Sequence, residues 1–460
     1  METASTASLP WKTYQKIGFR FALIFFLLFI ILLDWSANPV FSFLYYYGNL
    51  ANVLDGLIAW VGNDLFQIPY VIISPYDGEH NDRTYVYLLY FTIGVMAVIG
   101  TIIWSLLDRK RPGYNLLFYW FTVIIRYYLA FTMFLFGLYK FFRVQFPDLG
   151  YYTLTGQVGD MSPMHLAWAF FGYAHGYNVF MGIAECGGLL LLFRRTTTFG
   201  ALLVMGALAN VIAVNFSFDV HAKMYPVALF AMALFLVLKD ARRISRFFFT
   251  GQAVSLPKIQ APVFPRQWMY FVKTGVKILV IGYFLIGHVI NNIGYREYAR
   301  ESIKANLEYA GMYDVDLFVV NGDTIPADHP SRWQQLIIGD QMLDAVRLPG
   351  DSIAFLSMKS EDKEILVSGN PTQLLTNRQI IYNELGNTDD TYRKMDSVLV
   401  ARQMVSRFQF ELADSTTLSL RGTMKNDSVN VIARRKPLDI NDFRLMKRRF
   451  HWVTEANYFY

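Results

Sequence analysis

The chain has 460 residues, of which 54% are hydrophobic and only 17% carry a charged side chain, with a formal net charge of +6. A soluble globular domain usually has about 25% charged residues. This deficit argues against an ordinary soluble enzyme, a disordered protein and a nucleic-acid-binding protein.

The charges divide the chain into two unlike parts. Residues 1–295 hold 21 Lys and Arg against 13 Asp and Glu, a net of +8, whereas residues 296–460 hold 21 against 23, a net of −2. The first part therefore has 34 charges in 295 residues, and the second has 44 in 165. We expect one membrane region followed by one domain in water.

Apolar runs in the first part are long enough to cross a bilayer, which requires about 20 mostly apolar residues. The first run follows Lys12, Lys16 and Arg20, as in a signal peptide, but no small-residue cleavage pattern follows it, so we interpret it as an uncleaved anchor. Residues 51–66 include two aspartates, which favours an amphipathic helix at the membrane interface over a span. The seven candidate spans lie near 17–34, 84–107, 115–142, 178–194, 198–216, 223–239 and 268–291.

The orientation follows from the distribution of Lys and Arg in short loops, which favour the cytoplasmic side. With the N-terminus inside, the inner segments hold 14 such residues and the outer segments hold 4. Seven spans then put residues 296–460 outside. We predict a multi-pass protein of a bacterial inner (plasma) membrane, with a cytoplasmic N-terminus and a periplasmic C-terminal domain.

The exported domain has a pattern typical of β-structure. Residues 296–310 suggest a helix that leaves the membrane, and short alternating runs separated by turn signals such as 321–323 and 349–351 follow it. Residues 372–407 look more helical or irregular. We expect a small antiparallel sandwich or barrel that acts as a cap, a sensor or a partner-binding module, because no catalytic motif occurs in it.

The single cysteine, Cys186, lies in the fourth candidate span. One cysteine excludes an intrachain disulfide, a cysteine-pair redox site and a Cys-based metal site within this chain. The histidines 165 and 175 lack metal-ligand spacing, so we predict no metal site.

Ionisable side chains inside a bilayer are costly and usually have a partner. At about 1.5 Å of rise per residue, Arg126 lies roughly 16 Å from the inner surface and Glu185 roughly 10 Å from the outer one. These depths agree within side-chain reach, so we predict a buried Arg126–Glu185 pair. Asn210 has a similar depth, and Lys140 shares the face of Arg126 near the outer interface.

A second polar cluster is predicted at the outer mouth of the helices. Asp219 and Lys223 are four residues apart and can pair on a helix, and Asn215 and His221 lie in the same short stretch. We interpret Arg126, Glu185 and Lys140 as catalytic candidates above all, and the mouth residues together with Asn210 as substrate-binding candidates. The alternative is that the pair only locks the bundle and that lysines only extend to the interface.

Three pieces of the sequence carry a family resemblance: Arg126 with Gly137-Leu-Tyr-Lys140, then Gly182-Ile-Ala-Glu185, then Asn-Phe-Ser-Phe-Asp-Val-His-Ala-Lys at 215–223. Together they resemble the DoxX family of bacterial membrane proteins, over about 120 of the 460 residues. The last piece is similar to the family's Asn-Phe-x-x-Asp-Val-x-x-Lys ending, although His221-Ala222 stands where Pro-Val-like residues are expected.

The resemblance implies a four-helix membrane core and a relation to the large subunit of thiosulfate:quinone oxidoreductase. It therefore implies a lipid quinone or another small molecule as ligand, with Arg126, Lys140 and His221 as donors to the quinone oxygens. The cofactor is otherwise undetermined. Two hypotheses stay open beside a less favoured transporter: a quinone-linked oxidoreductase component, and a non-enzymatic membrane protein whose β domain binds a periplasmic or membrane partner or senses the envelope.

The expected fold is an α-helical polytopic membrane protein with a C-terminal β-rich extracytoplasmic domain. Residues 1–114 would form two spans and an interfacial helix, 115–250 the DoxX-like core, 251–311 the last span and a connecting helix, and 312–460 the β domain. The expected partners are the lipid bilayer, a quinone or other small molecule, and a protein, but no nucleic acid.

Overall fold

The computed structural model divides into two compact units. The first consists of Met1–Phe142 and Gly176–Asn292, and the second of Arg143–His175 and Ile293–Tyr460. The structure describes residues 11–33, 50–70, 72, 82–256, 264–306, 308–339, 344–359, 363–368, 381, 389–402, 404–424 and 426–447.

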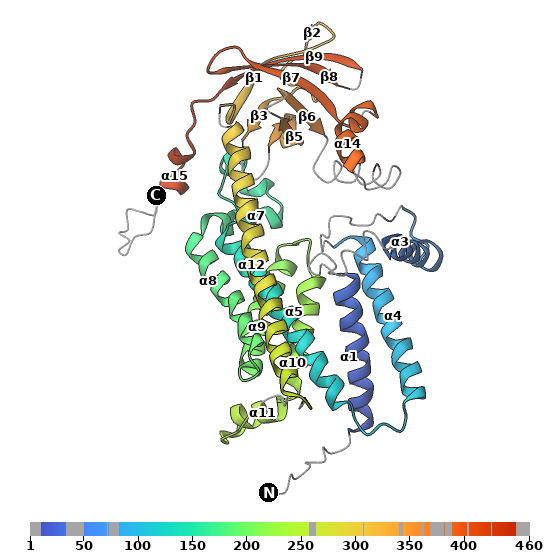
Figure 1. The fold of residues 1–460 in the computed structure, drawn as a ribbon. Helices are drawn as coiled ribbons and strands as arrows, with labels where there is room; N and C mark the ends of the chain where they lie inside the picture. The colour runs from blue at the N-terminus through green and yellow to red at the C-terminus, as the bar shows by residue number, and fades with distance from the viewer. Residues whose placement is uncertain are drawn as a thin grey trace. The chain divides into compact units, whose positions relative to one another are not determined.

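The described elements of the first unit are all helices (Figure 1). The predicted amphipathic helix is present as α3, Leu50–Trp60, extended by a π-helical turn, and its Asp55 accepts a hydrogen bond of 2.6 Å from Tyr85. Its longer helices are α1 Thr13–Leu32, α4 Thr84–Leu107, α5 Asn115–Phe141, α8 His175–Cys186, α9 Thr197–Ser217, α10 Met224–Leu238, α11 Ala241–Thr250 and the N-terminal part of α12 Gln267–Asn306.

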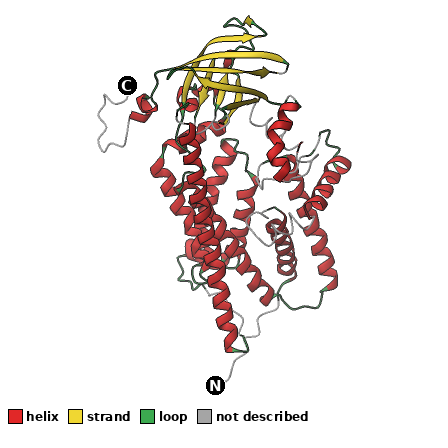
Figure 2. Ribbon diagram, turned by 45° about the horizontal axis from the view of Figure 1, so that its top comes forward, coloured by secondary structure: helices red, strands yellow, loops and turns green. Residues whose placement is uncertain are grey.

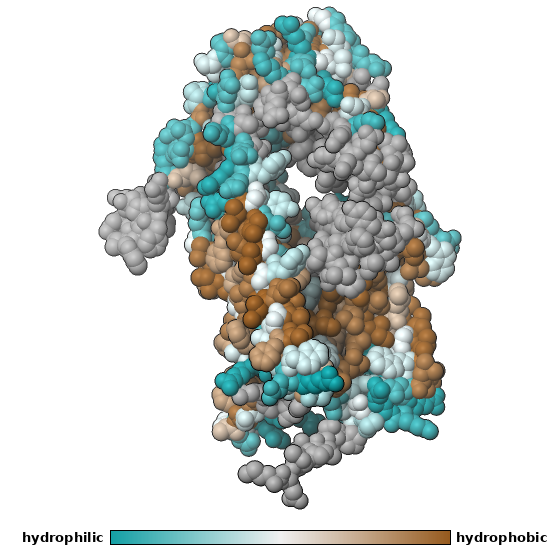
Figure 3. Space-filling model, in the orientation of Figure 1, coloured by the Kyte–Doolittle hydropathy of each residue, from teal (hydrophilic) through white to brown (hydrophobic). Residues whose placement is uncertain are grey.

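Five helices in the described ranges are long and apolar enough to cross a membrane: α1, α4, α5, α9 and α12. The number rises to six if α10 and α11, which bend by 78° where they meet, count as one span. The prediction of seven such helices is therefore only partly confirmed. On the face drawn in Figure 3, hydrophobic residues gather over the middle of this unit, as expected for the apolar faces of these helices.

The fourth predicted span, 178–194, is not one long α-helix. The α-helix α8 ends at Cys186, and a 3₁₀ segment, Gly187–Leu192, continues it. Close packing accompanies the change, because a Cβ on Gly188 would lie 2.7 Å from Met133 Cβ of α5. The hydropathy of residues 178–194 correctly indicated an apolar segment. It could not indicate the local change from α-helix to 3₁₀-helix.

The second unit contains an antiparallel β-barrel, which resolves the choice between sandwich and barrel. Strand β1 hydrogen-bonds to β3 on one side and to β9 on the other, and consecutive strands from β3 to β9 pair in turn, so the sheet closes (Figure 2). The short strand β2 pairs antiparallel with the C-terminal end of β1. The strands are β1 Gly311–Val320, β2 Asp323–Thr324, β3 Gln335–Ile338, β4 Ala345–Arg347, β5 Ile353–Lys359, β6 Glu364–Ser368, β7 Ser406–Leu412, β8 Thr417–Met424 and β9 Asp427–Arg435.

Alternating strand residues fill the barrel interior. In β9, Val429, Val431 and Ala433 are fully buried, while the residues between them are exposed. Aromatic side chains complete the core, with the ring of Trp333 5.1 Å from that of Phe408. The interior of a barrel of this size is about wide enough for side chains to fill it. A second cluster, which includes Leu399 of α14 Asp389–Ala401, packs separately.

The segment that connects α5 to α8 belongs to the barrel's unit. It forms α6 Tyr151–Thr155, a 3₁₀ turn and α7 Pro163–Tyr173. Arg347 of β4 donates a hydrogen bond of 3.0 Å to Thr155 Oγ1, and its guanidinium lies 5.9 Å from the centre of the Tyr152 ring. The barrel is thus tied to this connection, a link that the sequence did not reveal.

Candidate functional site

A buried ion pair joins α5 to α8, but its basic member is not the predicted one. Lys140 Nζ lies 2.9 Å from Glu185 Oε1, and the two side chains are only 6% and 4% exposed. The predicted Arg126–Glu185 pair is therefore wrong. Arg126 instead donates from Nε to the carbonyl oxygen of Leu191 over 2.7 Å.

Glycine contacts explain why Lys140 takes the place of Arg126. A Cβ on Gly137 would lie 2.6 Å from Cys186 Sγ and 2.8 Å from the carbonyl oxygen of Gly182. The two helices therefore meet where α5 has Gly137 and α8 has Gly182 to Cys186. Lys140 is three residues beyond Gly137, on the same face, and so lies opposite Glu185. Depth alone could not fix this register.

Arg126 is buried in the helical core. Its side chain is only 1% exposed, and its neighbours Ile125 and Leu129 on α5 belong to the buried apolar cluster of this unit. Its acceptor lies in the 3₁₀ segment, where the change of helix type leaves carbonyl groups free to accept from side chains. Asn210, which was predicted at the same depth, is exposed on α9 and is not brought to this contact.

The predicted cluster after α9 is present and includes a residue that we did not predict. Lys223 Nζ lies 2.7 Å from Asp219 Oδ1, which confirms their pairing across a turn. The same ammonium lies 3.2 Å from Asp82 Oδ2, and the backbone N–H of Lys223 donates to Asp82 Oδ1 over 3.0 Å. Hydrogen bonding to Asp219 raises the pKa of Lys223, and the same bond lowers the pKa of Asp219. Asp82 precedes α4 by two residues, and no spacing rule pointed to it.

Backbone contacts give this cluster its shape. Asn215 Nδ2 donates to the carbonyl oxygen of Ala222 over 2.9 Å, and the backbone carbonyl of His221 accepts from Asp82 N–H over 2.8 Å. The side chain of His221 is exposed. The Asn215 side chain and the His221 backbone therefore stabilise the turn between α9 and α10. Together with the ion pairs of Lys223, these contacts make the loop compact.

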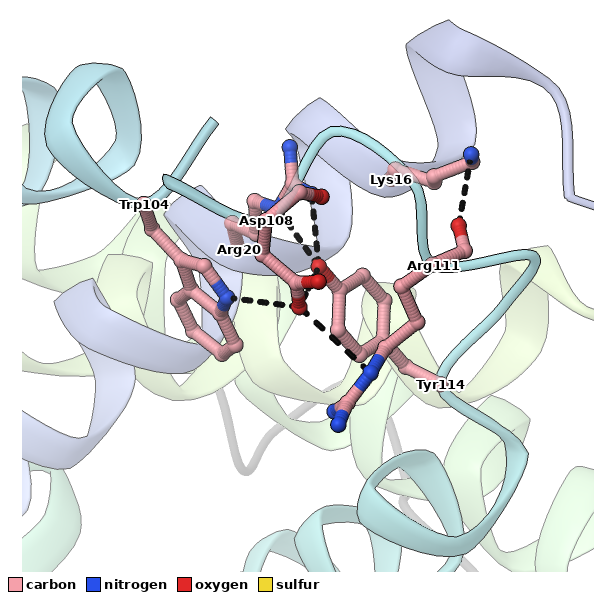
Figure 4. A network of polar contacts seen from close by, with 6 residues as sticks. All are labelled: Lys16, Arg20, Trp104, Asp108, Arg111 and Tyr114. Carbon is pink, nitrogen blue, oxygen red and sulfur yellow. Dashed lines mark hydrogen bonds and ion pairs between the residues drawn. The ribbon is translucent and has the colours of Figure 1, made fainter. Parts of the chain in front are cut away.

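The sequence did not predict a further polar network (Figure 4). It joins the N-terminal half of α1 to the C-terminal end of α4. Arg20, only 4% exposed, donates to Tyr114 Oη at 2.6 Å, to Ser105 Oγ at 2.8 Å and to the carbonyl oxygen of Asp108 at 2.9 Å. Tyr114 Oη donates in turn to Asp108 Oδ2 over 3.0 Å. The sequence suggested Arg20 only as a topology signal, because nothing in its spacing marks a bond to a residue about 90 positions away.

The two histidines of the α5–α8 connection have separate partners. His165 stacks on the Tyr152 ring at 5.2 Å between centres and shares a hydrogen bond of 2.9 Å with Thr153 Oγ1, and burial lowers its pKa. His175 Nε2 lies 3.2 Å from Asp148 Oδ1, which also pairs with Arg143. Within the described part of the chain, no group of three or more His, Cys, Asp or Glu side chains is arranged to hold a metal ion.

The chemistry of the predicted catalytic residues is limited by these contacts. Arg126 donates to a backbone carbonyl group, whereas Glu185 pairs with Lys140. Glu185 is the only acidic residue that the sequence placed at the depth of Arg126. One polar atom of these residues lacks a partner: the buried Glu185 Oε2 has no hydrogen-bond partner among the described residues. A buried carboxylate oxygen without a partner lowers the stability of the fold, and it can accept a hydrogen bond from a donor that enters the site.

Comparison with known proteins shows a family for part of the chain. No family model matches the chain, and no solved structure matches it. The uncharacterized protein YwoB of Bacillus subtilis (strain 168) is 32% identical over 133 residues, which are 27% of this chain and 79% of YwoB. Over this aligned stretch, the chain therefore belongs to the family of YwoB.

Proposed function

We propose that the chain is a multi-pass membrane protein whose β-barrel domain lies outside the cytoplasmic membrane and binds a protein partner there. The helical unit serves as its membrane base. The observation that carries this proposal is the separation of Arg126 from Glu185, since each is held in its own buried contact rather than facing the other across a shared pocket.

The membrane placement rests on the five apolar helices and on the distribution of basic residues. An outer barrel requires an odd number of crossings before residue 296. Helix α8 and its 3₁₀ continuation rise about 30 Å together, enough for one crossing. With α10 also crossing, the total is seven, and the N-terminus is cytoplasmic.

The covalent path between the units favours a binding or sensing role for the barrel. The chain passes between the units at 142–143, 175–176 and 292–293, so α5, α8 and α12 all lead into the barrel's unit. Arg347 and Thr155 connect the barrel to the segment between two of these helices. A partner that displaced the barrel would therefore pull on three helices, including both members of the Lys140–Glu185 contact.

A quinone-linked oxidoreductase component is the second candidate, and one atom favours it. Glu185 Oε2 is buried without a partner in the described residues, beside Lys140, so it offers an acceptor to a ligand hydroxyl. The resemblance of 126–246 to the DoxX family adds weight to this candidate. Here Lys140 would donate a hydrogen bond to a quinone oxygen.

Site-specific photo-crosslinking in intact cells separates the two candidates. A photoreactive residue replaces Ile432 or Arg421, which lie on the outward faces of β9 and β8, and a control replaces Val98 on the apolar surface of α4. The proposal predicts a protein adduct of one defined mass from the barrel positions and none from Val98. Absence of any barrel adduct, together with quinone reduction that Glu185→Gln abolishes, would establish the second candidate instead.

A further inference from the structure

A large groove lies at the end of the helical unit where α1 begins and α10 ends. Its volume is about 1,100 Å³, and it is lined by α1, α10 and α11 with a contribution from Phe118 of α5. Pockets for small molecules commonly range from about 300 to 1,000 Å³, so this groove is large enough for a bulky ligand. None of the residues predicted as catalytic or substrate-binding lines it.

The rim of the groove is strongly basic. Its described lining includes five Lys and Arg side chains and no carboxylate: Lys12, Lys239, Arg242, Arg243 and Arg246. The buried Asp240 nearby pairs with Lys239 at 3.0 Å and with Arg243 at 3.4 Å. No described acidic side chain pairs with Arg242 or Arg246, so at least two positive charges have no protein counterion in this part of the structure.

The floor of the groove is apolar. Phe19 and Phe26 of α1 and Leu234, Phe235 and Leu238 of α10 line it. Gly18 also lines it, and a Cβ added there would meet no atom within 4 Å. The groove therefore offers a hydrophobic channel next to a positively charged rim, a combination that matches a molecule with an anionic head and a hydrocarbon tail.

The bend between α10 and α11 creates this combination. The 78° turn directs α11 away from the α10 axis, and its arginines at 242, 243 and 246 lie within about one helical turn of each other. Phe247, Phe248 and Phe249 follow on α11 and are more than half exposed. A short helix with arginines and exposed aromatic side chains is typical of segments that lie in a membrane interface.

We propose that this groove binds one anionic phospholipid of the inner leaflet, with the phosphate at Arg242 and Arg246 and an acyl chain along the apolar floor. Basic pockets at the cytoplasmic ends of membrane helices are suited to such lipids. The proposal depends on the membrane placement of the helical unit but not on the partner-binding role of the barrel, and the two can fail separately.

The test measures lipid binding to the full chain in detergent. Native mass spectrometry or thermal-shift titration compares phosphatidylglycerol, phosphatidylcholine and inorganic phosphate as added probes. The variant Arg242→Gln/Arg246→Gln removes the unpaired charges, and Gly18→Phe fills the floor without changing charge. The matched control, Arg109→Gln/Lys110→Gln, removes two exposed basic residues from the loop between α4 and α5, neither of which lines the groove.

The expected result is preferential binding of phosphatidylglycerol. Loss of both arginines should weaken it about 30-fold, at about 1 kcal/mol per basic side chain and 1.4 kcal/mol per factor of ten. Gly18→Phe should weaken it as well, and the control should leave it unchanged. Equal binding of the two lipids, an equal loss in the control, binding of inorganic phosphate alone with the same affinity, or an unaffected Gly18→Phe would each overturn the proposal.

Discussion

Lys140 Nζ lies 2.9 Å from Glu185 Oε1 in a contact that is almost completely buried between α5 and α8. Removal of one partner from such a pair leaves an uncompensated charge. We therefore predict that Lys140→Met destabilises the helical unit by about 3–5 kcal/mol, measured by chemical unfolding in mild detergent.

The double variant Lys140→Met/Glu185→Gln is the matched control for this prediction. Because it removes both charges, it should recover much of the stability that the single variant loses. If both variants lost the same stability, the electrostatic account of the contact would be wrong.

The close approach of α5 and α8 at Gly137 gives a second prediction. A methyl group at this position would lie 2.6 Å from Cys186 Sγ, so Gly137→Ala must separate the helices or distort them. We expect a loss of about 1–3 kcal/mol in the same unfolding measurement.

Gly206 of α9 provides the comparison, because a Cβ there would meet no atom within 4 Å. Gly206→Ala should be neutral or should stabilise the helix by up to about 1 kcal/mol. An equal loss in the two alanine variants would show that the close approach at Gly137 does not limit stability.

The tie between the barrel and the α5–α8 connection predicts a local effect of Arg347→Ala. The variant loses the 3.0 Å hydrogen bond to Thr155 and the contact with the Tyr152 ring. Amide hydrogens of Tyr151–Thr155 and Pro163–Tyr173 should therefore exchange faster, as followed by mass spectrometry. Arg421→Ala, on an exposed part of β8, should leave this exchange unchanged, and equal exchange in both variants would argue against the tie.

Burial of His165 predicts a pH dependence in the second unit. Because its pKa is lowered from 6.5 in the folded state, the unfolded chain takes up a proton first as the pH falls. The contribution of the neutral imidazole to stability is complete above pH 6.5. It decreases below that value until the folded pKa is reached, by at most about 1.4 kcal/mol per pH unit.

Thermal unfolding of wild type and His165→Gln between pH 7.5 and pH 5 measures this contribution. The variant should show a shallower loss of stability on acidification, because glutamine does not titrate. Parallel curves for the two proteins would assign the pH dependence to other groups.

Composition and hydropathy predicted the coarse architecture well, because the positions of apolar residues along the chain indicate which segments bury apolar surface. The antiparallel β domain after residue 311 is confirmed, and the last span and the connecting helix that were predicted before it form one continuous helix, α12. The sequence left a sandwich and a barrel as alternatives, since barrel closure depends on pairing of β1 with β9 across more than 100 residues.

The candidate site was predicted less well, for a geometric reason. The sequence identified Glu185, Lys140 and Arg126 as the conspicuous charges, and all three are buried. Their partners depend on the register between helices, which Gly137 and Gly182 set through backbone contact. The Asp219–Lys223 pair was predictable because its two members are close in sequence, whereas the link of Lys223 to Asp82 spans 141 residues.

The orientation of the chain in the membrane underlies both proposals, and cysteine labelling in intact cells tests it most directly. In a Cys186→Ser background, single cysteines replace Ser415, in the exposed turn between β7 and β8, or Gln252, just after α11. A membrane-impermeant maleimide should label position 415 in intact cells and position 252 only after the membrane is opened. Labelling of 252 but not 415 in intact cells would contradict the account, because the barrel would then lie inside the cell and the basic groove outside.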